Sequence, residues 1–351
     1  MKKIFLSLLA IAALTACSKS DVQYSDPAEI GFAPATKNIT KAANEAGTLL
    51  TTEKLGVWAF WNGTNGATPE TSATYANYTS SYLTDATFVN RSQTANWGGD
   101  GVAYPWPTNG ALVFAGYTKP VNQTENFSVE YTLNDNTATT DISEADVMTF
   151  NNYTQSTETA NTYDLCWFGR TSSSYNYRAD GTPVSVTLSH ALTWITFNVK
   201  GKSEASLPVT NKWKVTKVIL NDIKNVGTGI CTGATATWSF AEDASSNDIS
   251  VYPNNSETGV EIPATATAVE STTNGVVVIP QAPTTVTVEW EYPVGSVTMK
   301  DSKTLPLTLS EGAPWKAGIH YTYTIVFDSN EILVAPSYGE WGKSDQTITV
   351  E

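Results

Sequence analysis

Apolar and polar residues alternate strictly along several segments of this chain, most clearly over 127–133, 286–292 and 321–327. Because successive side chains of a strand point to opposite faces, this period of two predicts strands with one buried side and one solvated side. Two continuous apolar runs, 57–61 and 112–117, predict strands that are covered on both faces. No long window shows helical spacing. The pattern therefore predicts an all-β protein made of antiparallel β-sandwiches.

Ser172-Ser173-Ser174 and Ala179-Asp180-Gly181-Thr182-Pro183 interrupt this pattern near residues 175–183. Such composition is typical of a connection between domains. We therefore expect an N-terminal β-sandwich domain over 55–181 and a C-terminal one over 182–351. In the second domain, the apolar positions change from even to odd numbers near residues 189–193. A shift of one residue reverses the buried face, and it predicts a β-bulge or a short helical turn there.

The first 16 residues have the features of a secretory signal peptide. Two lysines precede an apolar run, Ile4 to Leu14, that is too short to span a bilayer. The run ends in Leu14-Thr15-Ala16-Cys17, a lipobox pattern in which a signal peptidase cuts before the cysteine and the thiol receives a diacylglyceryl group. We predict removal of residues 1–16 and lipidation of Cys17, which would hold the protein at a membrane. The alternative is an ordinary signal peptide followed by a chance cysteine.

The segment 17–54 is polar and has no sustained periodicity. It predicts a lipidated tether that contains one short strand, Glu29 to Ala33. In that strand Ile30 and Phe32 lie two residues apart and so share a face.

Charge and cysteine content limit the possible partners. The formal net charge of −14 gives a surface that repels nucleic acid phosphates and anionic head groups, so no nucleic-acid partner is expected. Beyond Cys17 the chain has only Cys166 and Cys231, too few for a disulfide framework. We expect both to be small buried apolar residues, and a single disulfide between them is the alternative.

The sequence offers little that predicts catalysis or metal binding. Its two histidines, His190 and His320, lack the spacing of metal sites, and we expect hydrogen-bonded structural roles. The acidic residues between 135 and 146 do not match a calcium loop and are expected in a solvated loop. No nucleophile-elbow motif frames a serine. We therefore expect no enzymatic activity, no catalytic residue, no metal and no cofactor.

Several motifs, taken in order, resemble those of the fimbrillin family of type V pili. They are Tyr104-Pro105-Trp106-Pro107, Ser189-His190-Ala191-Leu192 leading into Ile195 to Val199, Val278-Ile279-Pro280-Gln281, Trp315 to Tyr323, and Trp341. The resemblance covers most of the chain after the signal peptide and implies two transthyretin-like β-sandwich domains in tandem. It also implies a lipoprotein of the outer membrane surface. A trypsin-like protease would remove an N-terminal strand, and subunits would then polymerise by strand insertion.

On this chain, the resemblance implies that the strand from Glu29 to Ala33 is removable and that cleavage follows Lys37 or Lys41. A fimbrillin would commonly offer an arginine there. The donor strand would be the C-terminal tail, in which Ile348 and Val350 alternate with polar residues. Burying two aliphatic side chains contributes about 3 to 6 kcal/mol, which is little for a durable polymer. Either the donor begins further back in the chain, or this is a tip or anchor subunit whose tail completes its own sheet.

We therefore expect a structural subunit of a surface fimbria that supports adhesion, with other fimbrial subunits as partners. The 11 tryptophans and 16 tyrosines suggest a second hypothesis, a surface lipoprotein that binds host or bacterial glycans or proteins. Most of these rings are expected in the cores, because they lie in strand-like runs. The loop-like stretches 97–101 and 175–177 are where exposed rings are expected.

Overall fold

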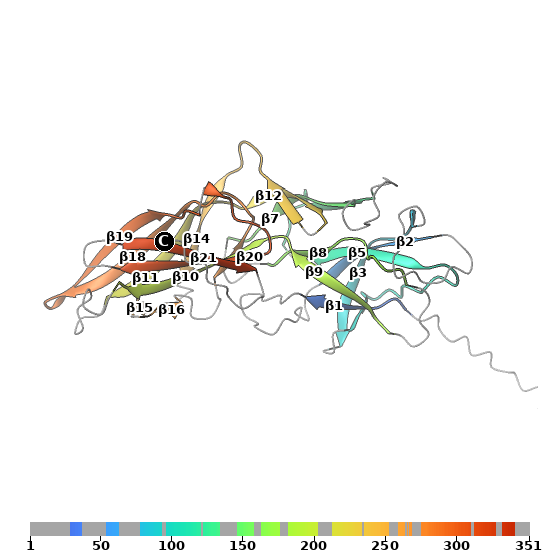
Figure 1. Ribbon diagram of the computed structural model, residues 1–351, viewed down its shortest axis with the longest axis horizontal. Coiled ribbons are helices and arrows are strands. Elements are labelled where there is room, and N and C mark those ends of the chain that lie inside the picture. Colours follow the sequence, from blue (N-terminus) through green and yellow to red (C-terminus); the bar gives the residue numbers. More distant parts are fainter. Residues whose placement is uncertain are drawn as a thin grey trace, which may run out of the picture.

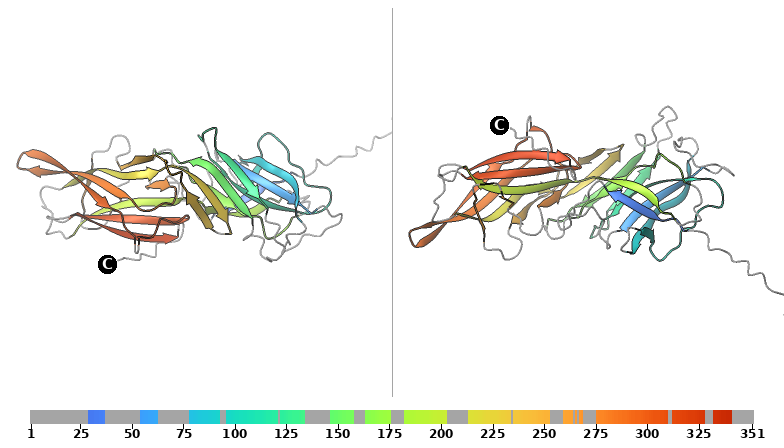
Figure 2. Two further views of the ribbon diagram at one scale, coloured as in Figure 1. Left: turned by 90° about the horizontal axis from the view of Figure 1, so that it is seen from above. Right: turned by 60° about the horizontal axis from the view of Figure 1, so that its bottom comes forward.

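The structure is a computed structural model. It describes residues 29–36, 54–62, 78–92, 96–120, 122–133, 146–157, 163–175, 182–202, 213–233, 235–252, 259–263, 265, 267–268, 275–309, 312–327 and 332–340. Across these ranges the protein consists of strands and connecting segments, and the prediction of an all-β protein is confirmed. No helix in the described ranges has the length and apolar character needed to cross a bilayer. The strands form an elongated molecule with two lobes placed end to end (Figures 1 and 2).

The first lobe contains a closed sheet of seven strands. In sheet order they are β1 (Phe32–Thr36), β4 (Asn96–Gly99), β3 (Ser80–Ser92), β2 (Lys54–Trp61), β5 (Leu112–Lys119), β8 (Cys166–Phe168) and β9 (Val184–His190). All neighbours are antiparallel except β1 and β9, which are parallel. The continuous apolar runs predicted to be covered on both faces form β2 and β5, and both strands are buried along most of their length.

A separate sheet of four strands packs against the closed sheet. Its order is β13 (Thr235–Ser239), β12 (Val226–Thr232), β7 (Val147–Thr154) and β6 (Ser128–Thr132). Aromatic side chains from this sheet, such as Phe150 and Tyr153, pack with Trp58 and Tyr117 of the closed sheet and with Ile279. This cluster is separate from the apolar interior of the closed sheet, which surrounds Phe32.

The second lobe consists of two further sheets that enclose one core. The first contains β16 (Thr267–Ala268), β10 (Thr193–Gly201), β20 (Ile319–Phe327) and β21 (Ile332–Glu340), with β17 (Val276–Val278) also paired to β10. The second contains β14 (Ser246–Tyr252), β11 (Lys214–Lys224), β18 (Thr285–Val294) and β19 (Val297–Pro306), with β15 (Val260–Glu261) paired to β11. Alternate residues of β18 and β20 face this core, as the sequence pattern predicted.

The change of phase near residue 190 marks the passage from one sheet to another. Strand β9 ends at His190 in the closed sheet, and β10 begins at Thr193 in the second lobe. The expected bulge or helical turn is therefore wrong. Two buried residues, Ala191 and Leu192, join the strands and are called the link below. The two sheets bury different faces of the chain. The apolar residues therefore change from even to odd positions where the chain crosses from one sheet to the other.

Backbone pairing crosses the predicted domain boundary at residues 181 and 182 in two places. Strand β9 pairs with β1 and β8, and β12 pairs with β7. The boundary, and the description of the two units as tandem transthyretin-like domains, stay predictions.

Candidate functional site

Strand β1 completes the closed sheet by pairing with a strand on each side. Phe32 lies opposite Trp97 of the antiparallel strand β4 and opposite Val184 of the parallel strand β9. The backbone NH of Val184 also donates a hydrogen bond of 2.7 Å to the carbonyl of Gly31. Two neighbouring strands therefore depend on β1 for backbone partners.

The apolar side chains of this segment point into the closed sheet. Ile30 is 1% exposed and Phe32 is fully buried. The Phe32 ring meets Phe88 edge to face with centroids 4.9 Å apart, and it meets Phe114 in the same way at 5.1 Å. Ile30 and Phe32 are thus part of the core, as their shared face in the sequence indicates.

The bounds of the first strand differ from the prediction. Regular pairing covers Phe32–Thr36, whereas Glu29 forms only an isolated bridge with Pro105. The strand begins later because pairing with β9 starts at Phe32 and continues toward Thr36.

The modification, cleavage and donor positions predicted from the sequence lie outside the described residues. They are Cys17, Lys37, Lys41, Ile348 and Val350. Their roles stay predictions.

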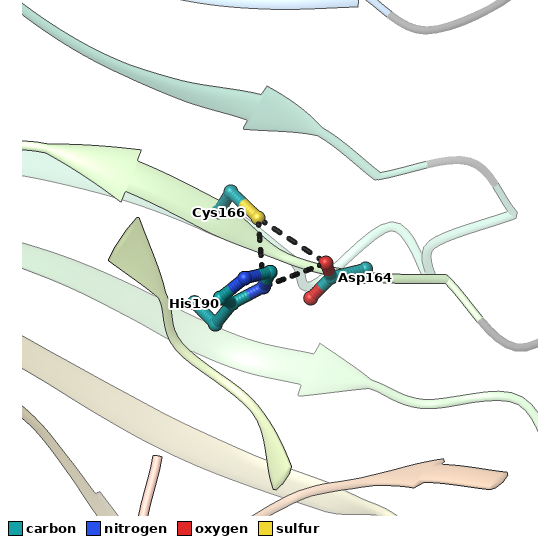
Figure 3. Close-up of side chains that lie close together, drawn as sticks. All are labelled: Asp164, Cys166 and His190. Carbon is teal, nitrogen blue, oxygen red and sulfur yellow. Dashed lines mark hydrogen bonds and ion pairs between the residues drawn. The ribbon is translucent and has the colours of Figure 1, made fainter. Parts of the chain in front are cut away.

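A cluster of three buried polar side chains lies where β8 and β9 pair (Figure 3). Cys166, the first residue of β8, is directly opposite His190, the last residue of β9. Asp164 precedes Cys166 by two residues, and its carboxylate lies beside the other two side chains. Asp164, Cys166 and His190 are 2%, 0% and 7% exposed.

The polar atoms of the three side chains form a closed triangle. The Nδ1 atom of His190 is 2.8 Å from Oδ2 of Asp164. The sulfur of Cys166 is 3.4 Å from the same oxygen and 3.6 Å from Nδ1 of His190. This is not the relay of a catalytic triad, in which the two ring nitrogens of the histidine face different partners. Here one nitrogen faces both the carboxylate and the thiol.

The surroundings fix the backbone of this segment and exclude water. The backbone NH of Cys166 donates to Oγ1 of Thr118 at 2.8 Å, and that hydroxyl lies 3.3 Å from the carbonyl oxygen of Asp164. Burial, followed by the charges of Asp164 and Cys166, raises the pKa of the nearby Tyr153 well above its usual value. The cluster thus lies in a buried environment of low polarity.

Sequence reasoning found only part of this cluster. The expected structural, hydrogen-bonded role fits the contacts of both His190 and His320, since the latter lies 2.8 Å from the hydroxyl of Thr196. Cys166 and Cys231 are buried thiols that are not joined by a disulfide. However, Cys166 has polar neighbours and is not simply a small apolar residue. The sequence feature that could have indicated the cluster is the spacing of Asp164 and Cys166, two residues apart, which in a strand places both side chains on one face.

The expectation of a solvated acidic loop is wrong for Asp146. Its carboxylate is 2.8 Å from Nε of Arg170 and 3.0 Å from the Nη2 atom of the same side chain, and both side chains are 1% exposed. The Tyr131 hydroxyl donates a further hydrogen bond to it at 2.5 Å. Arg170 follows β8 in the chain and neutralises this carboxylate in the interior. The other acidic residues of that segment lie outside the described residues.

The aromatic side chains are mostly structural. Trp97, expected in an exposed loop, is buried in β4 because it packs in the closed sheet beside Phe32. Tyr175 is half-buried, and its ring lies 6.1 Å from that of Phe114. The stretch 97–101 therefore does not present a Trp97 ring to solvent, whereas residues 176 and 177 lie outside the described residues.

A cavity of about 900 Å³ lies between the β12–β13 hairpin and the second lobe. Its lining includes the aromatic side chains of Trp238, Phe240 and Trp315 and the charged side chains of Lys224 and Lys316. The indole NH of Trp238 donates to the carbonyl of the link residue Ala191 at 2.7 Å, so this ring also has a structural contact.

Comparison with known proteins identifies the family. The model of the fimbrillin-like family matches residues 40–341. A search of curated proteins finds no match.

Solved structures with related folds include a fimbrial protein from Bacteroides vulgatus, which is 15% identical with a TM-score of 0.56 and is matched over 89% of this chain and 99% of its own. A fimbrial assembly protein from Parabacteroides distasonis is 14% identical, has a TM-score of 0.38, and is matched over 89% of this chain and 96% of its own. The first of these supports the fold, and the family model covers most of the sequence. The chain belongs to the fimbrillin-like family.

Proposed function

We propose that this chain is a structural subunit of a cell-surface fimbria that supports adhesion. It is exported as a lipoprotein, held at the outer membrane by the lipid on Cys17, and assembled with other fimbrial subunits by strand exchange. Cleavage after Lys37 or Lys41 starts this exchange by detaching β1. Family membership supports the fimbrial role, and the lipobox supports the anchor.

The observation that carries the proposal is the position of β1. The strand ends at Thr36, and Lys37 follows it directly. Once the chain is cut there, β1 is joined to the rest of the described subunit by non-covalent contacts. These are its pairing with β4 and β9 and the packing of Phe32 against Phe88 and Phe114. Loss of β1 then exposes a groove with unpaired backbone groups, which a strand of a neighbouring subunit fills by β-augmentation.

The groove selects a donor with apolar side chains at alternate positions. Ile30 and Phe32 leave two apolar vacancies lined by side chains such as Phe88 and Phe114. Full burial of each replacement contributes about 1.5 to 3 kcal/mol. Ile348 and Val350 have the required spacing of two residues and are the proposed donor side chains.

The alternative role is a tip or anchor subunit. In that case the tail carrying Ile348 and Val350 completes its own sheet and is not donated. A stalk subunit that has been cut accepts a donor strand from one neighbour and donates its own tail to another. A tip or anchor subunit does not donate its tail.

Limited trypsin digestion of residues 18–351 tests the proposal. The digest is followed by mass spectrometry, electrophoresis without boiling and negative-stain microscopy. We expect a cut after Lys37 or Lys41, release of the N-terminal peptide, and ladders or filaments. The Lys37→Gln, Lys41→Gln double variant should stay intact and monomeric. The Ile348→Asp, Val350→Asp double variant should be cut normally but should not polymerise.

Two outcomes contradict a polymerising role. The first is release of the peptide without polymers. The second is resistance of both lysines to trypsin while the fold stays intact. Either result would favour the tip, anchor or glycan-binding role.

Glycan binding is a second candidate function because the cavity beside the β12–β13 hairpin combines aromatic side chains with two lysines and the carboxylate of Asp222. Aromatic rings can stack on the apolar faces of sugars, and lysines can bind acidic groups. A glycan array with labelled residues 18–351 tests this function. We expect binding of a defined glycan and its weakening in Lys224→Gln, and an array without signal would rule the function out.

A further inference from the structure

We propose that Asp164, Cys166 and His190 bind one zinc ion in the folded protein. This site does not depend on the fimbrial assembly proposed above. The three residues offer a carboxylate oxygen, a thiol sulfur and an imidazole nitrogen within 4.8 Å of one another. A mixed sulfur, nitrogen and oxygen set is one that zinc binds well.

The distances fit tetrahedral coordination with little movement. With usual bond lengths, a tetrahedral zinc ion separates its sulfur ligand from nitrogen or oxygen ligands by about 3.6 Å. Cys166 Sγ is 3.6 Å from Nδ1 of His190 and 3.4 Å from Oδ2 of Asp164. The remaining side of the triangle, from Nδ1 to Oδ2, is 2.8 Å and would open to about 3.4 Å.

Hydrogen bonds can occupy at most two sides of this triangle. It has three sides, but at most two protons are available within it, one on the thiol and one on Nδ1. If both protons point to the carboxylate, the sulfur and Nδ1 face each other with no proton between them. If Nδ1 carries no proton, its lone pair faces the carboxylate oxygen at 2.8 Å. A cation at the centre would contact all three atoms at once.

A second observation points to the same ligand. Within the described part of the chain, the other carboxylate oxygen, Oδ1 of Asp164, is buried and has no hydrogen-bond partner. An unsatisfied buried carboxylate oxygen is costly. A zinc ion held by Sγ, Nδ1 and Oδ2 would also lie near Oδ1 of the same carboxylate. This second, longer contact distorts the tetrahedron and removes the cost.

The charges also balance. Binding takes the thiolate, the carboxylate and the neutral imidazole, so the thiol proton and any second ring proton leave to solvent. The two negative charges then match the double charge of the ion, and the complex is neutral in its buried environment. Because all three residues are buried, the ion enters as the chain folds.

The ion would join β8 to β9 at the end of their short ladder. Strand β9 is also the parallel partner of β1. Bound zinc would therefore hold β9 against β8 even after β1 has been removed.

The test uses residues 18–351 that are unfolded and refolded with one equivalent of Zn²⁺ or Co²⁺, or with a chelator. We expect one zinc per chain by elemental analysis after gel filtration, and a higher Tm than for the chelator sample. The cobalt sample should show a sulfur-to-cobalt charge-transfer band in the near ultraviolet. Cys231→Ala is the matched control, since it removes the other buried thiol and should keep both signals.

The variants Cys166→Ser and His190→Asn should lose the bound zinc, and their Tm should no longer depend on the metal. Measurements on the unsubstituted chain are enough to overturn the proposal, so the test does not require these variants to fold. Absence of the charge-transfer band together with equal Tm values with zinc and with chelator would show that no such site exists. Loss of the band in Cys231→Ala but not in Cys166→Ser would also overturn it.

Discussion

Phe32 of β1 and Phe88 of β3 meet edge to face with their ring centroids 4.9 Å apart. The first strand is thereby tied to a core that also contains Leu55 of β2 and Leu188 of β9, which lie 23 and 156 positions after Phe32. A segment that we propose to be removed thus contributes directly to the stability of the uncut subunit.

The Phe32→Ala substitution should lower the free energy of unfolding by about 3 to 5 kcal/mol, because it leaves a cavity between Phe88 and Phe114. Urea denaturation followed by tryptophan fluorescence measures the change. Val297→Ala is a suitable control because Val297 is 57% exposed, and it should shift the midpoint very little. Equal effects of the two substitutions would show that β1 does not support the core.

Replacing Arg170 by methionine should destabilise the protein by about 3 to 5 kcal/mol, because the buried Asp146 carboxylate then loses the guanidinium group beside it. Adding Asp146→Asn should recover part of the loss, since the amide removes the charge but still accepts the Tyr131 hydrogen bond. A double-mutant cycle in urea gives the coupling energy. If the losses of stability in the two single variants simply add in the double variant, Arg170 and Asp146 do not stabilise the fold as a pair.

The protein should lose stability above about pH 10. Burial raises the pKa of Tyr131 and Tyr153 well above the usual value, so only the unfolded chain releases these protons just above pH 10. The unfolded state then binds fewer protons than the folded one, and the free energy of unfolding falls as pH rises. Each such tyrosine contributes a slope of about 1.4 kcal/mol per pH unit.

Tyrosinate absorbance and circular dichroism, followed together from pH 8 to 12, measure this effect. Exposed tyrosines should titrate without a change in fold, and the buried ones should titrate only as the sheets unfold. In the Tyr153→Phe variant, the free energy of unfolding should fall less steeply with pH, by about 1.4 kcal/mol per pH unit. An unchanged slope in that variant would refute the assignment to Tyr153.

Alanine at Gly275 should disturb the pairing of β17 with β10. Gly275 has φ of +88°, and a Cβ atom there would lie 2.1 Å from the carbonyl oxygen of Ile195. Gly295 is the matched control, because its φ is +62° but nothing lies within 4 Å of an added Cβ. Gly295→Ala should cost only the left-handed backbone energy, about 1 to 2 kcal/mol. Gly275→Ala should cost clearly more by thermal unfolding, and equal losses would exclude the steric effect.

Periodicity predicted individual strands well and their partners poorly. The alternation over 321–327 depends only on which face of β20 is buried, and this is visible in one short stretch of sequence. The parallel pairing of β1 with β9 joins residues about 150 positions apart, and no local pattern carries that information. The same limit explains the change of phase at the link, which reflects two different sheets and not an irregular strand.

The polar interior was missed for a related reason. Cys166 and His190 become neighbours only when the register of β8 against β9 is known. Asp146 looked solvated because its sequence neighbours are polar, whereas its partner Arg170 lies 24 residues away. Pairs that satisfy buried charge are set by tertiary contacts, so single-sequence patterns do not reveal them.

The link has a mechanical consequence. Its backbone groups bond in three directions: the NH of Ala191 to Leu165, the carbonyl of Ala191 to Trp238, and the carbonyl of Leu192 to Gly318. No extended linker is available at this point to act as a hinge between the lobes, since β9 and β10 are two residues apart. Tension applied along the molecule would load these hydrogen bonds, so the subunit should resist both bending and stretching at the link.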